Sequence, residues 1–118
     1  MASTPIVSVS GVRGIVGDSL DASVLTRFAT AFGTFIASNS LSVGSEKTVV
    51  IGRDSRTSGE MVRHAVLAGL IATGCQVIDV GLCPTPTVLL MSKELNAQGS
   101  IVITASHNPK EWNGIEFA

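Results

Sequence analysis

The sequence predicts an α/β domain, a three-layer α/β/α sandwich around a mixed, mostly parallel sheet of about four strands. Short apolar runs that end at glycine or polar residues alternate with longer segments of helical periodicity, as is typical of βαβ units. Hydrophobic residues make up 45% of the chain and charged residues only 14%, which suits strands buried under helices on both faces. The length of 118 residues suits one domain, which we expect to span residues 1–118.

Strands are predicted for the apolar, mostly β-branched runs, which lie at residues 6–10, 48–51, 76–80 and 100–104, with a further short run from Gly114. Helices are expected over residues 21–38, 57–73 and 87–95. The first helix carries an apolar stripe that we expect in the core, formed by Leu25, Phe28, Phe32, Phe35 and Ile36. The second helix ends before a glycine cap, Gly74, and its predicted inward residues are Val62, Ala65, Val66, Gly69 and Leu70. Residues 39–47 are rich in serine and glycine, which predicts a surface loop.

The net charge and the lack of a leader pattern or a long apolar stretch argue against several classes of protein. The formal net charge is −1, which argues against binding to bulk nucleic acid or to an anionic membrane. The N-terminus has no basic and apolar leader pattern, and no stretch reaches the ~18 apolar residues of a membrane span. Cys75 and Cys83 have a spacing that suits neither a zinc site nor a disulfide framework. We therefore expect a cytoplasmic protein with buried free thiols and neither nucleic-acid nor membrane partners.

The segment Thr104-Ala105-Ser106-His107-Asn108-Pro109 is the strongest candidate site. It follows the apolar run at 100–104, and Pro109 opposes continuation of that strand. Ser106 is therefore expected on a tight loop at the carboxyl end of a buried strand, where open α/β sheets bind ligands. A hydroxyl beside an imidazole and an amide suits a nucleophile or a phosphate carrier. Taken alone, the segment is better explained as a simple turn built from Ser, Asn and Pro.

Two further segments place charged side chains next to glycine. Residues 11–17 hold three glycines around Arg13, which predicts a loop that allows backbone and guanidinium to approach phosphate; a solvent-facing turn is the alternative. Residues 52–56 follow the strand at 48–51 and share an edge with Ser106 if the two strands are parallel. Asp54 is interpreted there as part of an Arg–Asp network that locks loops together. Arg53 and Arg56 are left open between that role and sugar-phosphate binding.

Four motifs together resemble the α-D-phosphohexomutases, which include phosphoglucomutases, phosphomannomutases and phosphoglucosamine mutases. Residues 104–109, followed by Asn113-Gly114, resemble the active-site serine loop of that family. Ser10-Gly11-Val12-Arg13-Gly14 resembles its N-terminal Arg-Gly loop, and Gly52-Arg53-Asp54-Ser55-Arg56 its Gly-Arg-Asp-x-Arg segment. Gly81-Leu82-Cys83-Pro84-Thr85-Pro86 resembles its Gly-x-x-x-Thr-Pro turn. The motifs occur in the family's order over nearly the whole chain, which leaves little room for chance.

The resemblance implies the first of four domains of an enzyme that interconverts hexose 1-phosphate and hexose 6-phosphate. The reaction passes through a sugar bisphosphate, which also serves as activator. Ser106 would carry the transferable phosphate and, once phosphorylated, would bind Mg²⁺ together with ligands outside this chain. Catalytic roles are implied for Ser106, His107 and Arg13, and substrate contacts for Arg13, Arg53, Asn108 and Lys110. The hexose phosphate and the remaining domains are thus the expected partners, and the chain alone is expected to fold without catalysing.

Glu116 departs from the family pattern Asn-Gly-x-Lys, whose lysine is proposed as the general acid or base near the phosphoserine. Glu116 can be the base itself, Lys110 can supply the lost cation, or the position can be structural. We expect Glu116 to line the site without being the essential base, because a carboxylate beside a phosphoserine is electrostatically costly.

Two rival functions stand against the mutase interpretation. In a non-catalytic phosphate- or phosphosugar-binding module, Ser106 would only donate a hydrogen bond. A serine hydrolase is the weaker rival, because the chain has no Gly-x-Ser-x-Gly elbow and His107 is adjacent in sequence to the serine it would have to face.

Overall fold

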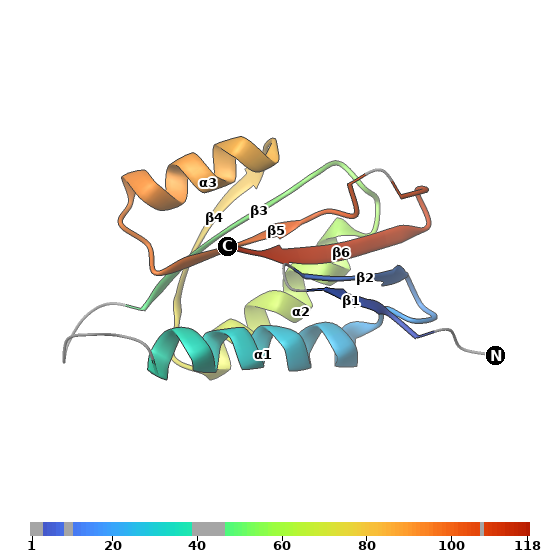
Figure 1. Cartoon of the computed structure of the whole chain (residues 1–118), viewed down its shortest axis with the longest axis horizontal. Coiled ribbons are helices and arrows are strands. Elements are labelled where there is room, and N and C mark those ends of the chain that lie inside the picture. The colour runs from blue at the N-terminus through green and yellow to red at the C-terminus, as the bar shows by residue number, and fades with distance from the viewer. Residues whose placement is uncertain (1–3, 9–10, 39–46, 107) are drawn as a thin grey trace.

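The computed structural model describes residues 4–8, 11–38, 47–106 and 108–118, and these form one sheet and three helices (Figure 1). The strands are β1 Ile6–Ser8, β2 Gly11–Ile15, β3 Thr48–Arg53, β4 Gln76–Leu82, β5 Gly99–Ile103 and β6 Trp112–Phe117. The helices are α1 Ala22–Ser38, α2 Gly59–Ala72 and α3 Thr85–Glu94. Most of the predicted loop at 39–47 lies outside the described residues.

The sheet is mixed, and its strand order is β1-β2-β6-β5-β3-β4. β3 pairs in parallel with both β4 and β5, as the predicted βαβ units require. The pairs β5–β6, β6–β2 and β2–β1 are antiparallel. The α/β class is therefore confirmed, whereas the expectations of about four strands and of mostly parallel pairing are wrong for the described sheet of six.

The strand that the sequence analysis does not predict is β2, because residues 11–17 have the composition of a glycine-rich loop. Residues 11–15 lie between β1 and β6 in the sheet. A Cβ atom on Gly11 would collide with the carbonyl oxygen of Ile115 in β6, so this glycine serves close approach of two strands instead of a turn. Of the strand predicted at 6–10, residues 6–8 form β1, and residues 9–10 lie outside the described part.

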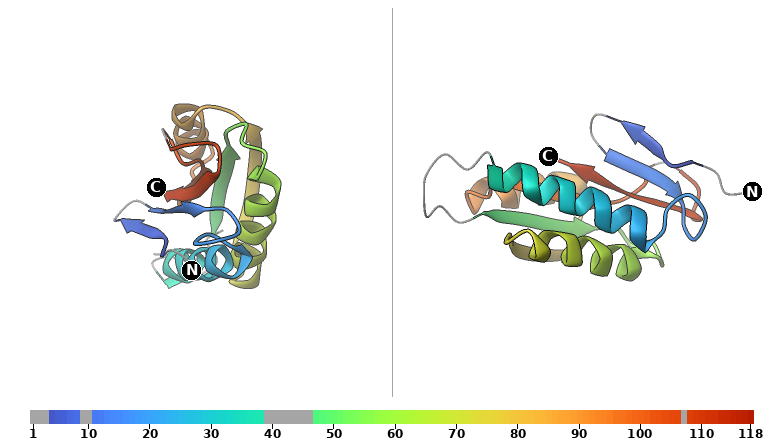
Figure 2. Two further views of the ribbon diagram at one scale, coloured as in Figure 1. Left: turned by 90° about the vertical axis from the view of Figure 1, so that its right-hand side faces the viewer. Right: turned by 90° about the horizontal axis from the view of Figure 1, so that it is seen from below.

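Helices cover both faces of the sheet, which confirms the three layers (Figure 2). α1 and α2 lie together on one face, over the larger apolar core, which includes Leu25, Val66 and Ile103. α3 lies on the other face, where Val88 packs against Val50 of β3 and Val102 of β5. Val102 and its neighbour Ile103 thus point to opposite faces, as strand geometry requires.

The helix α2 agrees best with its prediction. All its predicted inward residues are buried, and Gly74 follows it with φ +84° as the expected cap. In α1 the predicted stripe is only partly right, because Phe35 is 60% exposed while Ala29 and Gly33 are buried. The reason is close helix packing: a Cβ on Gly69 of α2 would lie 2.8 Å from the Cβ of Ala29, so α2 approaches the side of α1 that carries small residues.

Both cysteines are free, but they differ in burial. Cys75 is buried as expected, whereas Cys83 is only partly buried, so the expectation of buried thiols is wrong for Cys83. Burial of the Cys83 thiol, and then the negative charge of Asp79, raise its pKa above the ordinary value. In the described part of the chain, no helix combines the length and apolar character needed to cross a membrane.

Candidate functional site

The site lies at the carboxyl ends of two parallel strands. β3 and β5 are neighbours, with Arg53 paired to Ile103, so the loops that follow them meet at one edge of the sheet, as predicted. Ser106 lies on the loop after β5, is exposed, and has φ +53°. This left-handed conformation costs a non-glycine residue on the order of 1 kcal/mol, so surrounding contacts must hold it.

Two charged side chains reach Ser106 from the antiparallel half of the sheet. Glu116 of β6 pairs with Val102, which faces α3, so the side chain of Glu116 lies on that same face. Arg13 of β2 pairs with Gly114, two residues before Glu116, and therefore shares the face. Arg13 and Glu116 remain partly open to solvent, with side chains 39% and 25% exposed.

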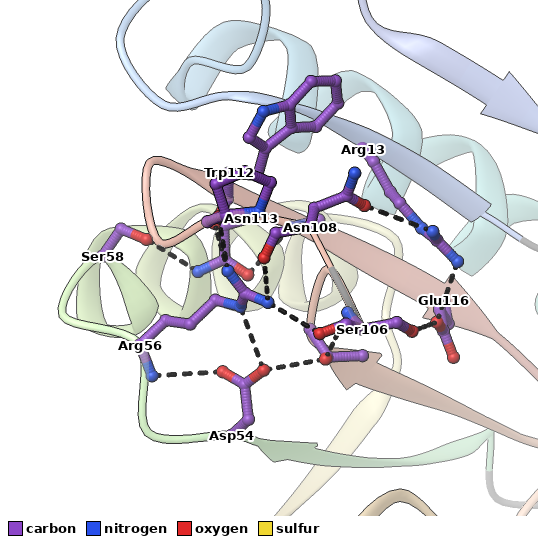
Figure 3. A network of polar contacts seen from close by, with 12 residues as sticks. Arg13, Asp54, Arg56, Ser58, Ser106, Asn108, Trp112, Asn113 and Glu116 are labelled. Atoms are coloured by element: carbon purple, nitrogen blue, oxygen red, sulfur yellow. Dashed lines mark hydrogen bonds and ion pairs between the residues drawn. The ribbon is translucent and has the colours of Figure 1, made fainter.

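These side chains contact one another around the serine hydroxyl (Figure 3). The Ser106 hydroxyl donates a hydrogen bond to Oε1 of Glu116 over 3.1 Å. The same carboxylate oxygen lies 3.5 Å from Nη2 of Arg13, whose Nη1 donates to Oδ1 of Asn108 over 3.3 Å. The structure thus brings together four of the predicted site residues, with the cation Arg13 linked to the hydroxyl through Glu116.

Below the hydroxyl, a chain of hydrogen bonds holds the backbone of Ser106. Its N–H donates to Oγ1 of Thr104 over 3.0 Å, and the Thr104 hydroxyl donates to Oδ2 of Asp54 over 2.8 Å. Asp54 also accepts from Arg56, at Oδ1 from the backbone N–H over 3.1 Å and at Oδ2 from Nε over 3.2 Å. Asp54 therefore belongs to a network that locks loops together, which confirms its interpretation.

Arg56 is the residue whose role the sequence left most open. Its Nη1 donates to the carbonyl oxygens of Pro109 and Trp112 over 2.8 and 3.2 Å. Its Nη2 donates to the carbonyl oxygens of Ser106 and Asn108 over 2.9 and 3.0 Å. No sequence signal assigns an arginine to carbonyl groups about fifty positions away, so this clamp could be seen only in three dimensions.

Asn113 fixes the C-terminal end of the serine loop, the segment between β5 and β6 that carries Ser106. Its side chain is fully buried, donates to the Ser58 hydroxyl over 2.8 Å and accepts from the N–H of Gly114. Ser58 is the N-cap residue of α2, but its side chain makes no capping hydrogen bond and instead accepts the hydrogen bond of Asn113. The beginning of α2 and the end of the loop are thereby joined.

The remaining predicted residues lie apart from the hydroxyl or outside the described chain. The guanidinium of Arg53 is ion-paired with Glu60 of α2 at 3.0 Å and packs against Gly59. Lys110 is exposed and, with Arg56 and Asn108, borders an open groove of about 480 Å³ on the outer side of the loop. His107 lies outside the described residues, so its catalytic role stays a prediction.

The oxygen atoms at this edge suit part of a Mg²⁺ site. Mg²⁺ is usually bound through one or two carboxylates together with phosphate oxygens and water. Among the described residues no group of three or more His, Cys, Asp and Glu side chains could hold a metal ion. The carboxylate of Glu116 lies beside the Ser106 hydroxyl but is paired with Arg13, so a Mg²⁺ bound to a phosphate on Ser106 would need its other ligands from elsewhere.

Fold and site together define a class, an α/β/α domain with an exposed serine, an arginine and a carboxylate near the carboxyl ends of its parallel strands. Residues 4–118 match the family described as phosphoglucomutase/phosphomannomutase, alpha/beta/alpha domain I. The chain therefore belongs to the phosphoglucomutase/phosphomannomutase family and corresponds to its domain I, which confirms the resemblance of the motifs.

Individual relatives agree with this assignment. A phosphoglucomutase/phosphomannomutase of Thermococcus kodakarensis is 47% identical over 108 residues, covering 91% of this chain and 23% of the relative. A phosphoglucosamine mutase of Rhodococcus opacus is 43% identical over 112 residues, covering 95% of this chain and 25% of the relative. The chain thus spans about a quarter of the length of these relatives.

Solved structures of the same family superpose well on this domain. A phosphoglucomutase/phosphomannomutase family protein from Burkholderia thailandensis matches with a TM-score of 0.79 at 34% identity, covering 92% of this chain and 24% of the other. A putative phosphomannomutase from Thermus thermophilus matches with a TM-score of 0.84 at 28% identity, covering 99% of this chain and 26% of the other. The six-stranded domain is therefore shared by these larger proteins.

Proposed function

We propose that this chain is the phosphoserine-bearing domain of a phosphohexomutase, which interconverts hexose 1-phosphate and hexose 6-phosphate through a sugar bisphosphate. One observation carries the proposal: Ser106, on the loop that resembles the family's serine motif, presents its hydroxyl at the sheet edge within a contact of Glu116, itself paired with Arg13. The relatives are named for glucose, mannose and glucosamine phosphates, so the substrate is proposed as a class, a hexose phosphate.

The proposed reaction consists of two phosphoryl transfers, each of which moves a different phosphoryl group. In the first transfer, a hydroxyl of the hexose monophosphate attacks the phosphorus of phosphorylated Ser106. The new O–P bond forms as the bond from phosphorus to Oγ breaks, Oγ gains a proton, and the sugar hydroxyl loses one. After the bisphosphate turns over in the site, Oγ attacks its other phosphorus and loses its proton. The bond from that phosphorus to the sugar oxygen breaks, and the sugar oxygen takes up a proton as the isomeric monophosphate is released.

Arg13 and Glu116 take complementary parts in this cycle. Phosphoryl transfer depends mainly on positioning and on neutralising spread negative charge, and Arg13 is paired with Glu116, the carboxylate that accepts the hydrogen bond of the hydroxyl. When Ser106 is unphosphorylated, Glu116 accepts its hydrogen bond and is placed to take its proton. When Ser106 is phosphorylated, the carboxylate faces a second anion, and Arg13 is expected to exchange Glu116 for the phosphate.

A bound Mg²⁺, held by a phosphate oxygen on Ser106 and by ligands outside this chain, would supply further neutralisation of the transferring phosphoryl group. Within this chain, Thr104, Asp54 and Arg56 keep the loop in place, while Asn108 holds the Arg13 guanidinium beside the hydroxyl. Contacts of Arg53, Lys110 and His107 with the sugar phosphate belong to the proposal as well, and the remaining domains would supply the rest of the site.

Phosphorylation of the full-length protein that carries this domain tests the function directly. Intact-protein mass spectrometry should show one covalent phosphate that is lost from the protein when excess hexose monophosphate is added. The variant Ser106→Ala should carry no phosphate and show no turnover, while Ser55→Ala, an exposed serine on the neighbouring loop, should behave as wild type. A protein that binds hexose phosphate but never carries the phosphate covalently would instead be the non-catalytic binding module.

The chain of 118 residues is expected to fold alone but not to catalyse. It has two apolar clusters around a continuous sheet, and among its described residues no complete metal site. Thermal unfolding followed by circular dichroism should be cooperative, and a coupled mutase assay should give no signal above background. Measurable turnover by this chain alone would show that the other domains are dispensable, and it would refute the proposal that they supply the rest of the active site.

A further inference from the structure

We infer that Arg56 is a positioning residue for phosphoryl transfer, which holds Ser106 in its left-handed conformation by binding the carbonyl groups of the serine loop. This inference rests on the proposed function of Ser106. Arg56 does not contact the Ser106 hydroxyl; it contacts the backbone that carries it. Its influence on the reaction is therefore geometric, and it differs from that of Arg13, which is paired with the carboxylate that contacts the hydroxyl.

The hydrogen-bonding capacity of Arg56 is fully used. A guanidinium has five N–H donors and no acceptor. Here Nε donates to Asp54, both donors of Nη1 go to the carbonyls of Pro109 and Trp112, and both donors of Nη2 go to those of Ser106 and Asn108. The side chain is only 13% exposed, and Asp54 at 3.2 Å compensates its charge. An arginine in this state has no donor left for a sugar phosphate. Of the two roles left open for Arg56, this favours locking the loops together over binding the sugar phosphate.

The peptide groups on both sides of the Ser106 Cα are held from one anchor. The N–H side is fixed through Thr104 to Asp54, and the C=O side is fixed by Arg56, which is itself bound to Asp54. Rotation of Ser106 out of φ +53° would break at least one of these bonds. The clamp therefore offsets the conformational cost of the left-handed residue and keeps the hydroxyl directed at Glu116.

No other side chain can reproduce this clamp. A lysine has three donors that radiate from one nitrogen, whereas the four loop carbonyls are reached by two nitrogens of a planar fork. In Arg56→Lys, at least one or two carbonyls and part of the Asp54 carboxylate would lose their partners. In Arg56→Ala, all of them would, and the loop would sample conformations in which Oγ points away from the transferred phosphate.

Steady-state kinetics of the full-length enzyme provide the first test. We expect kcat to fall about 100-fold in Arg56→Ala and about 10-fold in Arg56→Lys, since small misplacements of a reacting group have effects of this size. The KM for hexose monophosphate should change less than about threefold, because Arg56 makes no bond to the substrate. Guanidinium ion at millimolar concentration should restore part of the turnover of Arg56→Ala. The control is Arg63→Lys, which alters an arginine paired with Asp79 and should leave kcat unchanged.

Hydrogen–deuterium exchange of the same proteins gives a readout independent of turnover. The peptide covering residues 105–112 should exchange faster in both Arg56 variants than in wild type, and peptides from α1 should not. A kcat within about threefold of wild type for Arg56→Ala, or a loss expressed only in KM, would overturn the inference. Unchanged exchange of 105–112 would overturn it too. If wild-type protein carries no phosphate on Ser106 and has no turnover, the proposed function fails, while the exchange data still decide whether Arg56 holds the loop.

Discussion

Removal of the Glu116 charge should stabilise the phosphorylated form of the enzyme. The Ser106 hydroxyl lies 3.1 Å from Oε1 of Glu116, so a phosphate on that hydroxyl would place its oxygens about 4 Å from the carboxylate. Two unit charges at that distance repel by about 1 kcal/mol in water, and a phosphoserine carries about 1.5 to 2 negative charges. Ser106 is exposed and Glu116 is partly exposed, so water is taken as the reference for this pair. The repulsion of about 1.5 to 2 kcal/mol is then reduced to about 1 kcal/mol by salt at about 0.15 M.

The variant Glu116→Gln keeps the size and one acceptor oxygen while it removes the charge. The phosphoenzyme fraction, measured by intact-protein mass spectrometry at fixed ratios of hexose bisphosphate to monophosphate, should correspond to an equilibrium constant about five- to tenfold higher than in wild type. Arg13, freed from its pair at 3.5 Å, adds to the effect in the same direction. Glu94→Gln, at the end of α3, changes net charge equally and should not shift the equilibrium. An equilibrium constant in Glu116→Gln at or below that of wild type would refute the electrostatic reasoning.

Three further predictions concern the charge at position 116, the helix packing and the thiols. Glu116→Lys should retain at least wild-type turnover, because lysine favours phosphate and also exchanges a proton; collapse of turnover with loss of one limb of the pH–rate profile would make the carboxylate the essential base. Gly69→Ala should lower the free energy of unfolding by about 1 to 3 kcal/mol in urea titrations, since its Cβ would lie 2.8 Å from Ala29, whereas Ala68→Ser on the exposed side should be nearly neutral. Cys83 has a raised pKa, so at about pH 8 a smaller fraction of it is the reactive thiolate than in the unfolded chain. Iodoacetamide should therefore label Cys83 more slowly in the folded protein than in urea. The two rates should approach each other only as the pH rises through the raised pKa. Equal labelling rates at that pH would contradict the burial of its sulfur.

Patterns of local origin were predictable from the sequence. The apolar spacing of α2, its glycine cap and the runs that form β3, β4 and β5 are each encoded within a short stretch of chain, and the structure bears them out. The parallel pairing of β3 with β5 then follows from the βαβ rule, which is why Ser106 and Asp54 could be placed at the same edge.

Features that depend on contacts between distant segments were not predictable. Gly11 looks like a turn residue until the carbonyl of Ile115 is seen against it, and Phe35 looks like a core residue until α2 is seen to pack on the small residues of α1. The contacts of Arg56 cross fifty or more positions and involve carbonyl groups, which every residue has. Sequence patterns therefore identified the motif Gly-Arg-Asp-x-Arg but could not tell which of its arginines builds the loop.

The two faces of strand β6 serve different purposes, one in the hydrophobic core and the other at the candidate site. Ile115 is fully buried in the core under α1 and α2, while its neighbours Gly114 and Glu116 face Arg13 and Ser106 on the opposite side. A side chain cannot be added at Gly114 without moving the backbone, because a Cβ there would collide with the carbonyl oxygen of Val12 in β2. Glu116 lies on the face away from this core and is partly exposed. A substitution at this one position therefore changes the electrostatic potential at Ser106 and leaves the packing of the hydrophobic core unchanged.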